Sequence, residues 1–181
     1  MNLPNYITLV RVLLVPWFFI ALVSYTPGEE FYRWTAFWIF AVAALTDALD
    51  GFLARILNKQ TKLGRFLDPL ADKLLLLAGF VGLVYVEALM YRPPLWVTVS
   101  IVFRDFFIVA GILIIYLLTG NIRIQPNMLG RVTTVFQMGT LILILLQLRW
   151  AVPMCYATAM LTIVSMLAYA ARELRALADA T

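Results

Sequence analysis

Six long apolar stretches, separated by short polar segments, dominate the chain. They fall at about residues 12–25, 32–55, 67–88, 95–118, 128–148 and 153–171. Most are about 18 to 25 residues long, which is enough for a helix to cross a bilayer once flanking residues are counted. Residues 1–11 mix polar and apolar positions and predict a short interfacial helix. The pattern therefore predicts a single all-α integral membrane domain over residues 1–181, with six transmembrane helices and a short N-terminal interfacial helix.

Composition supports a membrane protein. The chain is 64% hydrophobic and 13% charged, whereas a soluble domain is about half apolar and a quarter charged. The net charge of +4 comes from basic residues in short loops. This arrangement favours contact with lipid headgroups or an anionic substrate, and no nucleic acid is expected. Cys155 is the only cysteine and there is no histidine, which excludes an intrachain disulfide and a histidine-ligated metal.

The lysines and arginines predict an orientation. Three of the fourteen, Arg33, Arg92 and Arg149, belong to one side of the predicted membrane domain. Eight others belong to the opposite side: Arg55, Lys59, Lys62, Arg65, Arg123, Arg131, Arg172 and Arg175. Because cytoplasmic loops carry the excess of positive charge, we expect both termini and the second loop to be cytoplasmic. In a bacterium this would be the inner membrane.

Four aspartates cluster around that second loop. Asp47 and Asp50 lie near the end of the second apolar stretch, and Asp68 and Asp72 near the start of the third. Spacings of three and four place each pair on one helix face, at the same end of adjacent helices. A structural alternative is that Asp68 caps a helix with Pro69 at its first position, while Asp47 and Asp50 pair with neighbouring basic residues.

Carboxylates at membrane depth are costly unless they pair, bind metal or face water. A set of oxygen ligands suits Mg²⁺ or Mn²⁺, and two such ions could grip a diphosphate. Without histidine, a carboxylate is also the natural base for an acceptor hydroxyl. Gly51 and Ala54 would let a substrate approach the helix, or would only let helices pack closely. Arg55 would contact phosphate, or would only add to the excess of positive charge on the cytoplasmic side.

The spacing of these residues resembles the signature of the CDP-alcohol phosphotransferase family. It reads Asp47-x2-Asp50-Gly51-x2-Ala54-Arg55-x8-Gly64-x3-Asp68-x3-Asp72. The resemblance implies that the aspartates bind metal and that Asp72, itself a metal ligand, is the catalytic base. It also implies a cytidine diphosphate donor, here CDP-diacylglycerol, release of CMP, and a homodimer.

The N-terminal residues carry a second resemblance to this family. Pro4, Asn5, Thr8 and Arg11 form the pattern Pro-Asn-x2-Thr-x2-Arg, which in many members lies near the nucleotide and diphosphate. Alternatively, Asn5 caps the helix and Arg11 snorkels to the headgroups. The residues expected to bind CDP-diacylglycerol are Asn5, Thr8, Asp50, Gly51, Ala54, Arg55 and Gly64.

Three arginines are candidates for binding a phosphate-bearing acceptor, because a guanidinium matches phosphate oxygens bidentately. Arg104 interrupts the fourth stretch beside Asp105, with which it could form a neutral pair, and Arg123 and Arg131 lie at the expected cytoplasmic end. Residues 130–137 resemble a segment of phosphatidyl-transferring members.

Two places in the sequence, residues 104–105 and residue 133, bear on which acceptor alcohol the enzyme uses. Bacterial phosphatidylglycerophosphate synthases often have Arg-Glu in place of Arg104-Asp105 and lysine in place of Thr133. Cardiolipin synthases of mitochondrial type are similar to this chain there. We expect transfer to glycerol 3-phosphate, giving phosphatidylglycerophosphate. The alternative acceptor is phosphatidylglycerol, which would give cardiolipin. Other alcohols are less favoured as acceptors. A reading of another class is a cation channel or transporter lined by the acids, but their clustering at one end favours the enzyme.

Overall fold

The computed structural model describes residues 3–57, 64–119 and 128–178, and describes side chains over residues 10–46, 71–111, 117 and 128–172. The described residues form six α-helices and no strands. They are α1 (Leu3–Val23), α2 (Glu30–Leu57), α3 (Gly64–Tyr85), α4 (Leu95–Thr119), α5 (Met128–Leu145) and α6 (Ala151–Ala178). The all-helical prediction is confirmed, and each observed helix corresponds to one predicted apolar stretch.

The N-terminal residues differ from the prediction. They form the first turns of α1, which runs without interruption from Leu3 to Val23 and includes Pro16. A separate interfacial helix is therefore not present. The polar residues before the apolar stretch include no helix breaker after Pro4, and a proline in the first turn of a helix is well tolerated. The chain consequently has no physical reason to end one helix and start another there.

The helices divide into two compact units. The first unit contains α1, α2, α3 and residues 141–151, which include the last turn of α5. Within it, α1 packs against both α2 and α3, whereas α2 and α3 touch each other much less. Phe18 and Leu22 of α1 are fully buried, together with Phe40 of α2 and Phe80 of α3. The approach of α1 to α3 is so close that a Cβ on Gly82 would lie 2.8 Å from the Leu22 side chain.

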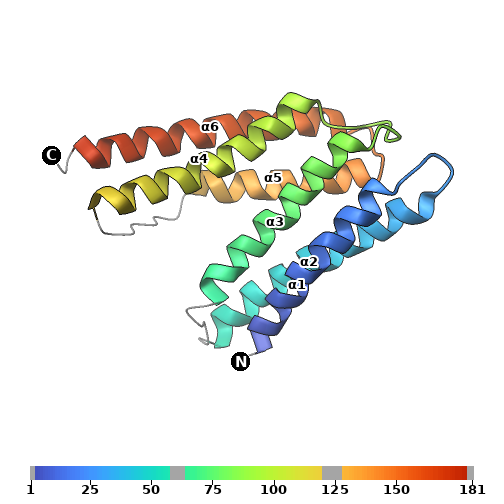
Figure 1. The fold of residues 1–181 in the computed structure, drawn as a ribbon, viewed down its shortest axis with the longest axis horizontal. Helices are drawn as coiled ribbons and strands as arrows, with labels where there is room; N and C mark the ends of the chain where they lie inside the picture. Colours follow the sequence, from blue (N-terminus) through green and yellow to red (C-terminus); the bar gives the residue numbers. More distant parts are fainter. Residues whose placement is uncertain (1–2, 58–63, 120–127, 179–181) are drawn as a thin grey trace. The chain divides into compact units, whose positions relative to one another are not determined.

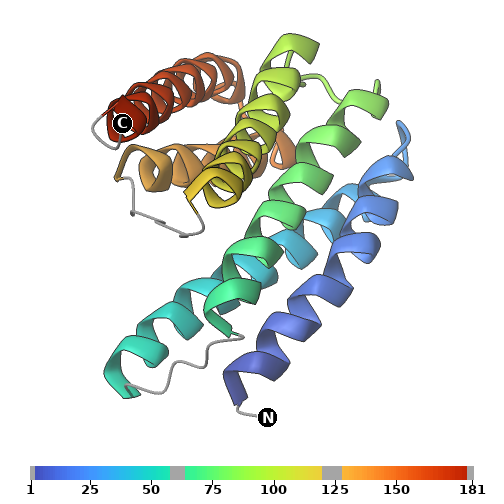
Figure 2. The same ribbon diagram turned by 60° about the vertical axis from the view of Figure 1, so that its left-hand side comes forward.

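Three helix ends meet at one end of this first unit. Both views show the start of α1, the end of α2 and the start of α3 together (Figures 1 and 2). The opposite end contains the start of α2 and the end of α3. This arrangement follows from the short loop that joins α2 to α3, because a short connection makes consecutive helices antiparallel neighbours.

The opposite end of the first unit is tied together by polar contacts. α5 ends in a Schellman-type turn, in which Leu148 N donates to Leu143 O and Gln147 N to Ile144 O. Gln147 occupies the left-handed position with φ of 53°, where glycine is usual. Its side chain accepts a hydrogen bond from Met90 N at 2.8 Å. Arg33 of α2 donates to Leu145 O at 2.6 Å.

The second unit contains α4, the part of α5 up to Thr140 and α6 from Val152 onward. Buried polar side chains recur every three or four residues along both α5 and α6. They are Thr133, Gln137 and Thr140 on α5, and Thr158, Thr162 and Ser165 on α6. We call the five of these residues that carry a hydroxyl, all except Gln137, the hydroxyl seam. The Oγ1 atoms of Thr140 and Thr158 lie 2.7 Å apart, so the seam joins the two helices directly.

Two helices of the described chain are long and apolar enough to cross a membrane. They are α5 (Met128–Leu145) and the segment Ala151–Arg172 of α6, and Val10–Val23 forms a shorter apolar helix. The expectation of a membrane protein is thus supported by two helices, while the six-span topology stays a prediction.

Candidate active site

The four signature aspartates lie on the two helix ends that meet. Asp47 and Asp50 belong to the last turns of α2, and Asp68 and Asp72 to the first turns of α3. All four positions are helical, so each pair shares a helix face as the spacing predicts. The side chains of Asp47, Asp50 and Asp68 lie outside the described residues, as do those of Gly51, Ala54, Arg55 and Gly64.

The backbone decides one structural alternative. α3 begins at Gly64, so Asp68 lies inside the helix, four residues after its first. A capping residue stands at the boundary, outside the helical φ/ψ region. The alternative that Asp68 serves as the N-cap, with Pro69 at the first helical position, is therefore wrong. Position 68 lies on the same face of α3 as position 72.

Asp72 is the signature acid whose side chain the structure describes. Arg11 Nη1 donates to Asp72 Oδ1 at 3.4 Å, linking α1 to α3. The Arg11 side chain is 1% exposed and that of Asp72 is 20% exposed. Arg11 therefore does not snorkel to the surface, and that alternative is wrong. The side chains of Asn5 and Thr8, from the same N-terminal pattern, lie outside the described residues.

Arg11, which contacts Asp72, is absent from the site residues that the sequence predicts. One signal for it was present. Arg11 is a single charge within an apolar helix, and intramembrane charges are functional candidates with a partner to be found. Its partner, Asp72, lies 61 residues away in sequence, and no periodicity within α1 could identify it.

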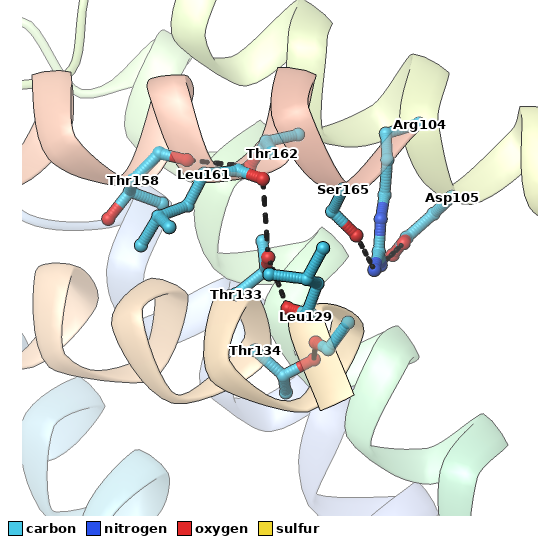
Figure 3. Close-up of polar contacts among 10 residues, drawn as sticks. Arg104, Asp105, Leu129, Thr133, Thr134, Thr158, Leu161, Thr162 and Ser165 are labelled. Carbon is cyan, nitrogen blue, oxygen red and sulfur yellow. Dashed lines mark hydrogen bonds and ion pairs between the residues drawn. The ribbon is translucent and has the colours of Figure 1, made fainter. Parts of the chain in front are cut away.

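Arg104 and Asp105 pair with each other in the second unit. Arg104 Nη1 lies 2.6 Å from Asp105 Oδ1, and Nη2 donates to Ser165 Oγ at 3.1 Å (Figure 3). Arg104 is buried, with 4% of its surface exposed. Its Nε is also buried and has no hydrogen-bond partner among the described residues. The two residues thus form a neighbour pair, and Arg104 keeps one donor that the described part of the chain does not use.

The other two acceptor candidates are placed differently. Arg131 is exposed in the first turn of α5, and Arg123 lies outside the described residues. Thr133, where related enzymes often have lysine, is fully buried, and its hydroxyl donates to Leu129 O at 2.7 Å (Figure 3). Of the three arginines, Arg104 and Arg131 are therefore in the same unit, one enclosed and one open to its surroundings.

The residues present are suited to a divalent metal by their chemistry. No group of three or more histidine, cysteine, aspartate or glutamate side chains occurs among those described, and three of the four signature acids are outside that set. The backbone nevertheless brings four carboxylate-bearing positions to one end of the first unit. Carboxylate oxygens are the ligands that Mg²⁺ and Mn²⁺ prefer, so the donor set fits such an ion.

Comparison with known proteins identifies the class to which this fold and signature belong. The sequence model of the CDP-alcohol phosphatidyltransferase family matches residues 1–169, which include the signature and all of helices α1 to α5. The chain belongs to the CDP-alcohol phosphatidyltransferase family. Family membership confirms the resemblance on which the site was predicted, and it leaves the channel or transporter reading without support.

Three relatives show where in the family the chain lies. It is 37% identical over 142 residues to a Bacillus subtilis protein named CDP-diacylglycerol–glycerol-3-phosphate 3-phosphatidyltransferase, covering 74% of this chain and 70% of the relative. The Escherichia coli K12 protein of the same name is 35% identical, with coverage of 93% and 92%. A Mycobacterium tuberculosis protein named probable phosphatidylglycerophosphate synthase is 34% identical, with coverage of 96% and 82%.

Proposed function

We propose that this chain transfers the phosphatidyl group of CDP-diacylglycerol to glycerol 3-phosphate, with release of CMP. The observation that carries this proposal is the eight-position signature, placed on two helix ends that meet, in a chain of this family. The names of relatives aligned over nearly its whole length support glycerol 3-phosphate as acceptor. The product would be phosphatidylglycerophosphate, which places the chain in phospholipid biosynthesis.

The exposed surface supports integral membrane embedding. Large apolar side chains are exposed on every helix, among them Trp17, Trp38, Phe106, Val135 and Met160. Buried positions, by contrast, include arginines and the hydroxyl seam. A soluble protein rarely exposes large contiguous apolar patches, whereas lipid tails favour such a surface. This surface supports six membrane-spanning helices. The excess of lysine and arginine on one side supports a cytoplasmic location for both termini and the acid cluster, and a homodimer is what the family resemblance implies.

The four aspartates are the residues that would hold one or two divalent ions. When bound, Mg²⁺ or Mn²⁺ would grip the diphosphate and neutralise charge that develops at phosphorus. Asn5, Thr8, Gly51, Ala54, Arg55 and Gly64 would complete the donor site, as the family signature implies. Arg104, Arg123 and Arg131 would hold the acceptor phosphate.

The partial exposure of Asp72 supports its proposed role as the base. Its carboxylate is partly exposed, while Arg11 lies against Oδ1. In the proposed reaction Asp72 takes the proton of the acceptor hydroxyl. The acceptor oxygen then forms a bond to the phosphorus that carries diacylglycerol. The bond from that phosphorus to the bridging oxygen breaks, and CMP leaves with the electron pair.

The test is to offer acceptors separately to the purified enzyme. The chain in detergent receives CDP-diacylglycerol and Mg²⁺ or Mn²⁺, with glycerol 3-phosphate or with phosphatidylglycerol, while CMP and the lipid product are measured. We expect phosphatidylglycerophosphate from the first acceptor. Cardiolipin from the second alone would instead make Asp105 and Thr133 the better guides to specificity. Absence of CMP with every alcohol tested would refute the proposal.

A further inference from the structure

The arginines of the first unit differ sharply in their burial. Arg92, which pairs with Glu87, is 47% exposed, and Arg33, which pairs with Glu30, is 12% exposed. Arg11 is 1% exposed and is one of the largest fully buried side chains of the described residues. Enclosing a guanidinium costs several kcal/mol unless an anion and hydrogen bonds compensate it. The burial of Arg11 therefore calls for a structural or functional explanation.

The pair that Arg11 forms is asymmetric. Its cation is enclosed, but its anion, Asp72, keeps 20% of its side chain exposed. A buried guanidinium thus contacts a carboxylate that stays partly exposed. An ion pair whose purpose was only to join α1 to α3 would gain nothing from leaving its carboxylate partly open. Apolar contacts such as that of Leu22 with Gly82 already join these helices.

We propose that Arg11 is a positioning residue that holds the Asp72 carboxylate in its reactive orientation. The inference rests on the proposed function, in which Asp72 takes the proton of the acceptor hydroxyl. The contact of Arg11 with Oδ1 would restrict rotation of the Asp72 carboxylate and so hold it ready for the acceptor hydroxyl. Misplacement of a reacting group by about 1 Å can cost about 100-fold in rate, so this contact affects turnover.

Burial distinguishes this role from direct binding of substrate. A residue that grips a diphosphate must present its guanidinium to the ligand, and Arg11 is enclosed. Its replacement should therefore lower kcat and leave donor affinity nearly unchanged. Direct contact with CDP-diacylglycerol predicts the reverse, a weaker affinity for the donor.

The deciding variant is Arg11→Met, which keeps much of the side-chain volume and removes the charge. With the full chain in detergent and Mg²⁺ present, kcat and KM are measured from CMP release. Donor affinity is measured by titration calorimetry with CDP-diacylglycerol and no acceptor. We expect kcat to fall by about 10- to 100-fold, with both KM values and the donor Kd within threefold of the wild type. An unchanged kcat, or a donor Kd raised tenfold, would overturn the proposal.

The matched control is Arg33→Met. Arg33 is also a largely buried, ion-paired arginine of the first unit, but it belongs to the opposite end of α2. We expect lower thermal stability from this variant with kcat within twofold of the wild type. An equal loss of kcat in Arg33→Met would show that general destabilisation explains the effect, which would also overturn the proposal.

A second substitution keeps the test decisive if Arg11→Met does not fold. Arg11→Lys retains the positive charge but replaces the planar group with a single ammonium. We expect it to fold and to have a kcat between those of the wild type and Arg11→Met, or below the wild type if Arg11→Met cannot be measured. A wild-type kcat in Arg11→Lys, when Arg11→Met is unfolded, would overturn the positioning role. Failure of the proposed function is distinguishable, because the wild type itself would then release no CMP.

Discussion

The two units of the protein bury polar groups of different kinds. In the first unit the enclosed polar group is a cation, Arg11, paired with a partly open carboxylate. In the second unit most buried polar groups are neutral, and the hydroxyl seam satisfies many of its donors within α5 and α6. Among the side chains described in that unit, Arg104 is the buried charged residue, beside Asp105 and Ser165.

The difference indicates a division of labour. Buried ions carry a large desolvation cost and contribute little net stability, so their retention suggests use in chemistry. Hydroxyl pairs between helices cost little and stabilise modestly, by about 0.6 kcal/mol on average in a membrane. The first unit would therefore carry the reaction and the second would hold helices together and bind the acceptor. Four experiments would break or sharpen this contrast.

Removal of divalent metal should have the largest effect. Because four carboxylate-bearing positions meet in the first unit, EDTA should abolish CMP release, and excess Mg²⁺ or Mn²⁺ should restore it. The helices of both units should survive, as judged by an unchanged far-ultraviolet circular dichroism spectrum. Full activity after exhaustive chelation would contradict a metal site formed by the aspartates.

Replacement of the proposed base comes next. Asp72→Asn keeps the shape of the side chain but cannot accept the proton, and general bases contribute about 10²- to 10⁴-fold. We expect kcat for CMP release to fall about 1,000-fold. Glu30→Gln is the control, because Glu30 is also an ion-paired acid of the first unit, and its activity should stay within twofold. A variant Asp72→Asn that is folded and fully active would remove Asp72 from the mechanism.

The spacing of apolar stretches predicted all six helices for two reasons. A segment in a bilayer must form its backbone hydrogen bonds within itself, which favours a helix. The thickness of the bilayer also sets the length of each apolar stretch. The ends of α2 to α5 were predicted to within about three residues. By contrast, α1 starts at Leu3 and not at residue 12, and α6 continues through the charged residues after 171 to Ala178. The end of α5 shows the limit. Its left-handed position is filled by Gln147, and the contact with Met90 that holds this residue is not visible in the local sequence.

For the candidate site, too, the sequence predicted the helix positions of the residues but not the contacts between helices. The spacing of the aspartates fixed their helix faces, and the short loop placed the two pairs at one end of the unit. The role of Arg11 was not predictable, because its burial depends on how α1 packs between α2 and α3. The pairing of Arg104 with Asp105 was open for a similar reason: whether adjacent side chains turn toward each other depends on a third group, here Ser165.

Two of the acceptor-binding candidates in the second unit, Arg104 and Arg131, should respond differently to substitution. Arg131 is exposed, so Arg131→Gln should raise the KM for glycerol 3-phosphate about tenfold, the loss of one charge-assisted hydrogen bond, without changing stability. Arg104 is buried and paired, so Arg104→Gln should also destabilise the protein, by about 3 kcal/mol.

Steady-state kinetics and thermal unfolding in detergent measure the two effects. Arg149→Gln is the control, since Arg149 is exposed and is expected on the opposite side of the membrane. An unchanged KM in both Arg104→Gln and Arg131→Gln would place the acceptor phosphate elsewhere.

Substitutions in the hydroxyl seam should have the smallest effect of all. They should lower stability slightly and leave kcat unchanged, in contrast to substitutions of Arg11 or Asp72 in the first unit. Thr140→Val preserves the shape of the side chain but removes the 2.7 Å contact with Thr158, whose hydroxyl keeps only its longer contact with Phe136 O at 3.3 Å. We expect a loss of about 0.6 kcal/mol, a fall in Tm of about 1–2 °C, and kcat within twofold of the wild type. Thr35→Val is the control, because the Thr35 hydroxyl donates to the Phe31 carbonyl of its own helix and its loss should not affect helix packing.

The double variant Thr140→Val/Thr158→Val tests whether the two hydroxyls act as a pair. Leaving one buried hydroxyl without its partner costs more than replacing both by apolar groups of the same shape. The double variant should therefore be less destabilised than the sum of the single variants. Strict additivity would mean that each hydroxyl serves only its own helix. A loss of kcat comparable to that of Arg11→Met would show that the second unit takes part in the reaction beyond holding its helices and the acceptor.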